Sequence, residues 1–166
     1  MIFTKSKTFH SQSNSGFTMV EVLVACSIIT IIVLTTMSSA QKSLQLSSLA
    51  LRQTQANFLL EEGAEAVRSI RDNNWTTISN LILDANYYLS YDLNSNSWLL
   101  GQTPNTIDSF TRIVVISAVK RDASDDIASS GTLDNGTKKV TITISWPGST
   151  GTVSKSLSFY LANIYN

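Results

Sequence analysis

The chain has 166 residues, and its 12 Lys and Arg residues balance its 12 Asp and Glu residues. This length fits one compact domain with an extension, and a balanced chain without a basic block argues against a nucleic-acid-binding surface. The single histidine, His10, lies near the N-terminus, so the rest of the chain lacks the residues for Ser-His-Asp or Cys-His catalysis and for most zinc sites. The seven glycines form no phosphate-binding loop. We expect no enzymatic activity, no cofactor and no nucleic-acid partner.

A polar leader at residues 1–16 precedes an apolar run at residues 17–37. The leader carries Lys5 and Lys7 and no acidic residue, and the run carries one charge, Glu21. About 20 apolar residues cross a bilayer core as an α-helix, and basic residues favour the cytoplasmic side. The sequence therefore predicts a single pass through the cytoplasmic membrane, with the N-terminus inside. A carboxylate in such a run is costly and usually functional; the alternative is that Glu21 reaches water at the headgroups.

Helix-forming composition continues without a proline through residues 38–72. Six apolar residues there recur at steps of three, four and seven, which indicates one face of an amphipathic helix. They are Leu49, Ala56, Leu60, Ala64, Val67 and Ile70. The opposite face carries Gln45, Arg52, Glu61 and Glu65. We expect one continuous helix from about Phe17 to about Arg71, ended by the turn-forming residues 72–74.

From Trp75 onward the pattern becomes that of β-strands. Segments with alternating or β-branched residues occupy 87–91, 97–100, 110–120, 139–146 and 153–161. Asn135-Gly136 and residues 147–151 are turn signals. We expect residues 73–166 to form an antiparallel sheet of four or five strands, with one face on the helix and a Thr- and Ser-rich face in water. The predicted fold class is α+β.

Four aspartates between the third and fourth long predicted strands form the one candidate metal site. They are Asp122, Asp125, Asp126 and Asp134. Oxygen-rich loops can bind calcium, but the spacing matches no EF-hand loop, so a solvated acidic loop is the favoured interpretation and no metal is expected. Cys26, the sole cysteine, is expected to act as a small hydrophobe. Trp75, Trp98 and Trp146 are expected to pack in the core and hairpin rather than form a stacking platform.

Residues 16–21 read Gly-Phe-Thr-Met-Val-Glu, and the apolar run follows at once. This junction resembles the signal of type IV prepilins and type II secretion pseudopilins, with Met19-Val20 in place of the common Leu-Ile. The resemblance implies a pilin-like fold, cleavage after Gly16 by a prepilin peptidase, and N-methylation of the new terminal Phe17. It also implies that Glu21 serves filament assembly, pairing with the terminal amine of a neighbouring subunit. That amine would be largely cationic near neutral pH.

The resemblance further implies partners and locations. The partners are the prepilin peptidase and methyltransferase, other pilin or pseudopilin subunits, the pilus assembly platform and the cytoplasmic membrane. The sheet domain would lie outside the membrane and then on a cell-surface filament or a periplasmic pseudopilus. A minor pilin is favoured, because the proline found in the first half of many major-pilin helices is missing here. Residues 64–75 also resemble a stretch of minor pilins of the type IV pilus modification group.

Four alternatives stay open. The first is a pseudopilin of a type II secretion system, and the second is a competence-type pilin that captures DNA. The third is a secreted or anchored domain that uses residues 17–37 only as a membrane anchor. The fourth is an ordinary secretory signal, because Ser38-Ser39-Ala40 resembles a small-x-small cleavage site, although the apolar run is longer than usual for one.

Overall fold

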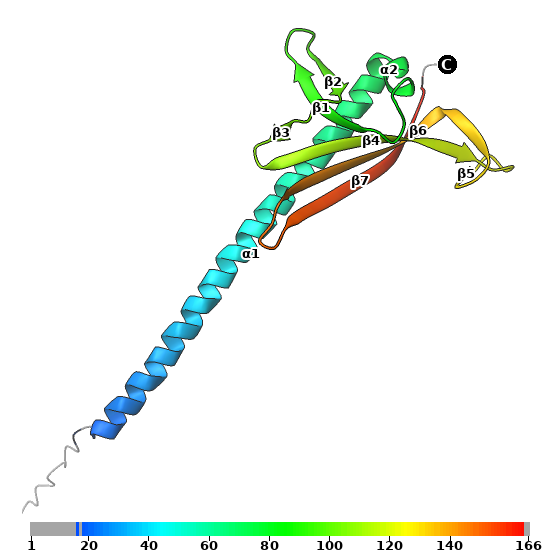
Figure 1. Ribbon diagram of the computed structural model, residues 1–166. Coiled ribbons are helices and arrows are strands. Elements are labelled where there is room, and N and C mark those ends of the chain that lie inside the picture. Colours follow the sequence, from blue (N-terminus) through cyan, green and yellow to red (C-terminus); the bar gives the residue numbers. More distant parts are fainter. Residues whose placement is uncertain (1–15, 17, 165–166) are drawn as a thin grey trace, which may run out of the picture. The chain divides into compact units, whose positions relative to one another are not determined.

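The computed structural model describes residue 16 and residues 18–164 of the chain. It divides into two compact units, Met1–Ser48 and Leu49–Asn166. The helix α1 (Met19–Asn73) contributes its first part to one unit and its remainder to the other. An antiparallel sheet makes up most of the second unit (Figure 1). The predicted α+β class, a long helix packed on a C-terminal antiparallel sheet, is therefore confirmed.

Five long strands form the sheet in the order β2-β1-β4-β6-β7. They are β1 (Asn86–Asp92), β2 (Ser97–Gly101), β4 (Phe110–Arg121), β6 (Thr132–Pro147) and β7 (Thr152–Ala162). Two strands of two residues, β3 (Thr106–Ile107) and β5 (Ile127–Ala128), pair with β4. The predicted hairpin is confirmed as β1 and β2, with Leu89 opposite Leu100.

The core of the second unit lies between α1 and one face of the sheet. The buried residues that α1 contributes to this core are Ala56, Leu60, Gly63, Ala64, Ala66, Val67 and Ile70. On β6 the inward residues Ile142 and Ile144 are fully buried, whereas the alternate residues Thr141 and Thr143 lie on the outer face. Each buried isoleucine stabilises the fold by about 1.5–3 kcal/mol relative to an exposed one. Leu49, which we predicted to lie on the buried face, is exposed, because the buried residues of α1 begin only at Ala56.

A buried arginine on β4 contacts the helix where α1 carries a glycine. Arg112 is 2% exposed, and its Nη1 donates to the Leu59 carbonyl oxygen at 3.3 Å and to Glu62 Oε2 at 2.9 Å. A Cβ atom added at Gly63 would lie 3.2 Å from Arg112 Cδ and 3.3 Å from Ile142 Cδ1. The missing side chain therefore allows the arginine stem and the sheet to approach the helix closely.

Two local predictions were wrong. Strands were expected from Trp75 onward, but a short helix, α2 (Trp75–Ser79), follows α1, because the Asn74 side chain accepts a hydrogen bond from the Thr76 amide at 2.9 Å and caps it. Asn135-Gly136 was expected to form a turn, but it lies within β6 at an irregularity in the pairing with β4. There Ala118 pairs with Lys138 and the next residue, Val119, pairs with Asp134, so three residues of β6 are accommodated as a bulge.

Candidate processing and assembly site

Thr18 and Glu21 form two reciprocal hydrogen bonds at the start of α1. The Thr18 amide donates to Glu21 Oε2 at 3.3 Å, and the Glu21 amide donates to Thr18 Oγ1 at 3.3 Å. This reciprocal pair is a capping box, in which a threonine and a glutamate three residues later bond two of the backbone amides that lack partners inside the helix. The carboxylate also lies at the positive end of the helix dipole. Sequence reasoning missed this arrangement, although Thr-x-x-Glu ahead of an apolar run is its usual signal.

The capping box stands directly before a fully exposed apolar surface. Met19 is 81% exposed, and the large apolar side chains that follow to Met37 are all at least 50% exposed. Five hydroxyls within residues 27–38 donate to the carbonyl oxygen four residues earlier at 2.7–3.0 Å; they belong to Ser27, Thr30, Thr35, Thr36 and Ser38. These polar groups are satisfied within the helix, as a hydrocarbon environment requires. By length and composition, α1 is the one helix among residues 18–164 able to cross a membrane.

The predicted cleavage residues are only partly within the described chain. Gly16 is described and is exposed, whereas Phe17 and the leader at residues 1–15 lie outside the described residues. Cleavage after Gly16 and N-methylation of Phe17 therefore remain predictions. The role of Glu21 in assembly also remains a prediction, since the structure holds one chain.

Residues 11–37 match a family model described as the prokaryotic N-terminal methylation motif. No curated protein and no solved structure matches the chain significantly. The chain is thus prepilin-like, with a prepilin-type methylation motif and a pilin-like α+β fold. Proteins with this motif are structural subunits rather than enzymes. The motif implies processing by a prepilin peptidase, anchoring in the inner membrane before assembly, and assembly with other pilins.

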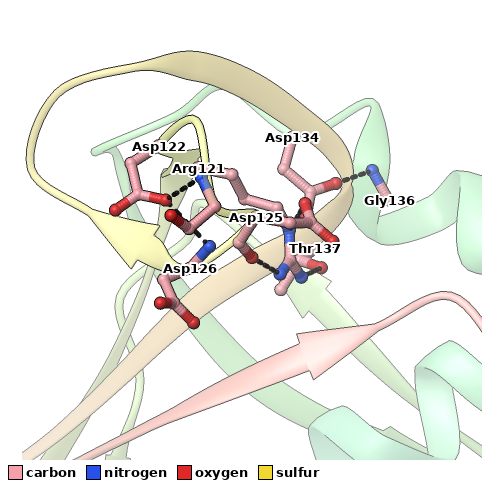
Figure 2. A network of polar contacts seen from close by, with 8 residues as sticks. Arg121, Asp122, Asp125, Asp126, Asp134, Gly136 and Thr137 are labelled. Atoms are coloured by element: carbon pink, nitrogen blue, oxygen red, sulfur yellow. Dashed lines mark hydrogen bonds and ion pairs between the residues drawn. The ribbon is translucent and has the colours of Figure 1, made fainter.

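The four candidate calcium ligands lie around Arg121 at the end of β4 (Figure 2). Arg121 Nε donates to Asp134 Oδ2 at 2.7 Å, and its Nη1 donates to the Asp125 carbonyl oxygen at 2.7 Å. The hydrogen bond from Arg121 holds the pKa of the Asp134 carboxyl below its usual value, and Thr137 and the Gly136 amide act in the same direction. Asp134 belongs to β6 rather than to the loop in which we expected it.

The remaining aspartates shape the turn between β4 and β5. Asp122 Oδ1 accepts hydrogen bonds from the Ser124 amide at 2.8 Å and the Asp126 amide at 3.1 Å. Among residues 18–164, no group of three or more His, Cys, Asp or Glu side chains is arranged to hold a metal ion. The expectation that these aspartates hold no metal remains a prediction, and the contacts of Asp122 and Asp134 are those of a structured turn.

The three tryptophans lie in and beside the core. Trp146 is 2% exposed, and its ring centre lies 5.6 Å from that of Phe110. Trp98 meets Tyr91 edge to face at 5.3 Å, and both Trp75 and Trp98 are partly buried against the core. The prediction that these rings pack in the core and hairpin is therefore confirmed. Cys26 is exposed on α1 and is unpaired within the described residues.

Proposed function

We propose that this protein is a structural subunit of a type IV filament, most simply a minor pilin. It is cut after Gly16, methylated at Phe17 and assembled through its N-terminal helix. The observation that carries the proposal is the match of residues 11–37 to the methylation motif, together with a pilin-like fold. The capping box supports it, because Glu21 is held at the end of α1 where cleavage would create the new amine.

The proposed assembly step exchanges one partner of Glu21 for another. Cleavage after Gly16 leaves the Thr18 amide in place as a peptide amide, so the capping box survives maturation. An unpaired carboxylate is expensive in hydrocarbon, and the capping box lowers that cost while the subunit waits in the membrane. In a filament, the cationic amine of a neighbouring subunit then offers Glu21 a charged partner.

The choice of a minor pilin rests on the long helix. The helix α1 runs through residues 37–39 without a proline, unlike the helices of many major pilins. A pseudopilin of a type II secretion system shares this feature and is the second candidate. The two are separated by the location of the mature chain in a host that carries both systems. A minor pilin is recovered with sheared surface filaments, whereas a pseudopilin remains in the periplasm and its deletion blocks the release of secreted proteins.

The first test is the N-terminus of the mature chain, by intact and peptide mass spectrometry after expression with a prepilin peptidase. We expect a chain that begins at N-methylated Phe17. A chain that begins at Gln41 would identify an ordinary secretory signal. An uncut chain would identify a simple membrane anchor, and either result contradicts the proposal.

The second test separates cleavage from assembly. Glu21→Ala should still be cleaved, because the scissile bond is untouched, but its assembled fraction should fall at least tenfold, because the amine of the neighbouring subunit loses its partner. Ser27→Ala is the matched control, because that hydroxyl bonds only to its own helix in this structure. Sheared filaments and membranes are compared by immunoblot. If Glu21→Ala and the unmodified chain assembled equally well, the helix would serve only as a membrane anchor, which would contradict the proposal.

A further inference from the structure

The bulge of β6 contains the one Asn-Gly pair of the sequence, Asn135-Gly136. Both residues are exposed, and neither has a partner residue in the pairing of β6 with β4 or β7. Asparagine is chemically labile, and it is most labile before glycine. The backbone nitrogen of the following residue attacks the asparagine side-chain carbonyl, and glycine has no side chain to obstruct the approach. The bulge therefore presents a reactive asparagine on the surface of the sheet.

Asp134 contacts the nitrogen that would carry out this attack. The Gly136 N–H donates to Asp134 Oδ1 at 2.8 Å, across Asn135 (Figure 2). This is the hydrogen bond of an Asx-turn, and it is strengthened because the acceptor is a charged carboxylate. To react, the Gly136 nitrogen must lose its proton and turn toward the Asn135 Cγ atom. The bond to Asp134 opposes both changes, because it holds the proton in place and directs the N–H toward the carboxylate.

Two other strands hold Asp134 and Gly136 in these positions. On β4, Arg121 Nε donates to Asp134 Oδ2 at 2.7 Å, which leaves Oδ1 to the glycine amide. After the end of β7, the Asn163 amide donates to the Gly136 carbonyl oxygen at 2.8 Å. Gly136 is thus fixed through both its N–H and its C=O group. The closed geometry of the Asn-Gly pair is therefore a product of the folded sheet.

We propose that Asn135 is a deamidation site that the Asp134–Gly136 hydrogen bond keeps closed in the folded chain. When that bond opens, solvent hydroxide removes the Gly136 amide proton, and the nitrogen forms a bond to Asn135 Cγ. The bond from Cγ to the side-chain nitrogen then breaks, that nitrogen takes a proton from water, and ammonia leaves. Water hydrolyses the resulting succinimide ring at either carbonyl, which gives aspartate or isoaspartate without any oxidation or reduction.

The reaction would change both the charge and the backbone of the bulge. Either product adds a carboxylate to a region where four aspartates already lie around Arg121 (Figure 2). Isoaspartate also inserts a methylene group into the main chain of β6, directly before the residue that binds Asn163. We expect this product to break that contact and to loosen the adjoining ends of β6 and β7. The site lies outside the N-terminal motif, so its chemistry does not depend on the proposed assembly into a filament.

The deciding experiment measures the rate of deamidation at residue 135 in the full chain. The protein is incubated in detergent micelles in mildly alkaline buffer and digested in acid, and peptide mass spectrometry then quantifies aspartate and isoaspartate. Asp134→Ala should deamidate about tenfold faster than the unmodified chain, because it loses a hydrogen bond to a charged acceptor. Asp122→Ala is the matched control. It removes an aspartate of the same region whose Oδ1 accepts from the Ser124 and Asp126 amides and not from Gly136.

A third variant tests whether the acceleration passes through the Gly136 nitrogen. A Cβ atom at Gly136 would lie 3.4 Å from Asp134 Oδ1, which is an ordinary contact, so the folded chain tolerates alanine there. The methyl group obstructs the attack on Asn135. Gly136→Ala combined with Asp134→Ala should therefore return deamidation to the slow rate of the unmodified chain. A double variant as fast as Asp134→Ala would contradict the proposed route.

A fold control separates the loss of one hydrogen bond from the loss of the strand. Amide exchange at Val140, which is buried on β6, should stay slow in Asp134→Ala. If it quickens, the isosteric Asp134→Asn decides, because it keeps a weaker, uncharged acceptor and should deamidate at a rate between those of the unmodified chain and Asp134→Ala. A synthetic peptide of residues 131–140 gives the rate without the fold, and it should exceed that of the unmodified chain at least as much as Asp134→Ala does.

Three results would overturn the inference. The first is an unmodified chain that deamidates as fast as the peptide, because the site would then not be closed. The second is an equal rate in Asp134→Ala, Asp134→Asn and the unmodified chain, because strand rigidity without Asp134 would then protect Asn135. The third is an equal acceleration in Asp122→Ala and Asp134→Ala, which would assign the effect to general loosening of the turn.

Discussion

Glu21 shows how one carboxylate is accommodated at the start of an apolar helix. Its side chain accepts from the Thr18 amide, and its own amide donates to the Thr18 hydroxyl. The pair therefore needs no partner chain to satisfy these groups. An acidic side chain in the first turn is also favoured by the helix dipole. Thr18 is thus a positioning residue for the carboxylate that the proposed function uses.

Replacing Thr18 should loosen the first turn of α1. Thr18→Ala removes the hydroxyl that accepts from the Glu21 amide, and loss of such a cap costs about 1 kcal/mol. We expect amide hydrogen exchange at Val20 and Glu21 to quicken roughly fivefold in the full chain in detergent micelles. Thr18→Ser keeps the hydroxyl and should exchange like the unmodified chain. Unchanged exchange in Thr18→Ala would show that the capping box does not hold the helix start.

Asp134 makes the end of the sheet sensitive to acid. Its pKa is lowered from 3.8, mainly because Arg121 donates a hydrogen bond to the ionised form. A carboxyl whose folded pKa lies below its unfolded pKa contributes stability above the unfolded pKa and loses it as the pH falls through the folded pKa. The contacts around Arg121 should therefore hold at neutral pH and loosen only below about pH 4.

Amide exchange at Gly136, whose N–H donates to Asp134 Oδ1 at 2.8 Å, reports this change. The exchange should quicken below about pH 4 in the unmodified chain, after correction for the intrinsic pH dependence of exchange. In Asp134→Asn the protection should be lower at neutral pH and should no longer change through the acid range. A transition near pH 6 would point to a group other than Asp134.

The two parts of the helix α1 are exposed to different environments. Its first part presents apolar residues on every side, as a lipid-exposed or bundled helix does. Its later part buries one face on the sheet, and its large exposed side chains are polar apart from Leu49, Leu51 and Phe58. At Gly63 the helix carries no side chain, which lets the Arg112 stem lie close beneath it. The residue pattern of one helix thus changes with the surface that each part meets.

Two glycines, each directly before a strand of the sheet, should differ in how much stability is lost when a side chain is added. Gly131 and Gly151 have φ of 137° and 142°, which disfavour any other residue, and such backbone strain costs on the order of 1–3 kcal/mol. A Cβ atom at Gly131 would also lie 2.0 Å from the Arg121 carbonyl oxygen, whereas at Gly151 nothing lies within 4 Å. Gly131→Ala should therefore lower the free energy of unfolding more than Gly151→Ala, and chemical denaturation of the two variants measures the difference. Equal losses in the free energy of unfolding would mean that backbone strain alone determines the cost of alanine at both positions.

At the scale of the whole molecule, the core is confined to the second unit. Among the residues that the structure describes, every buried apolar residue lies between Ala56 and Leu161, within the unit Leu49–Asn166. The core therefore does not depend on the membrane segment. The charges of the chain are balanced, so the chain has no strong net field with which to attract a polyanion.

A fragment spanning Leu49–Asn166 should fold by itself. We expect a soluble protein that unfolds in one cooperative step, because it retains all of the buried residues. A fragment that begins at residue 65 lacks Ala56, Leu60 and Ala64 and should be strongly destabilised, since loss of one buried leucine side chain alone typically costs about 2–5 kcal/mol. Circular dichroism during thermal unfolding compares them. A first fragment that unfolds gradually would show that the sheet needs the preceding part of α1.

The sequence by itself determined the long helix, the α+β class and the methylation motif. Each depends on contiguous residues: an apolar run, a strand alternation, and a short signal at residues 16–21. The register of the sheet, the bulge at Asn135-Gly136 and the helix α2 were decided only by the tertiary structure. Long-range pairing and local caps there outweigh the turn and strand preferences of single residues.

The same division applies to the candidate site. The position of Glu21 was evident from the sequence, because a charge in an apolar run stands out. Its bond to Thr18 required a folded helix terminus, in which particular amides lack partners. Asp134 was read as part of an acidic loop, but β4 and β6 bring it to Arg121, 13 residues away along the chain. Likewise, the exposure of Leu51 and Phe58 became visible only when the sheet had occupied the other face of α1, because packing decides which of two apolar faces is left uncovered.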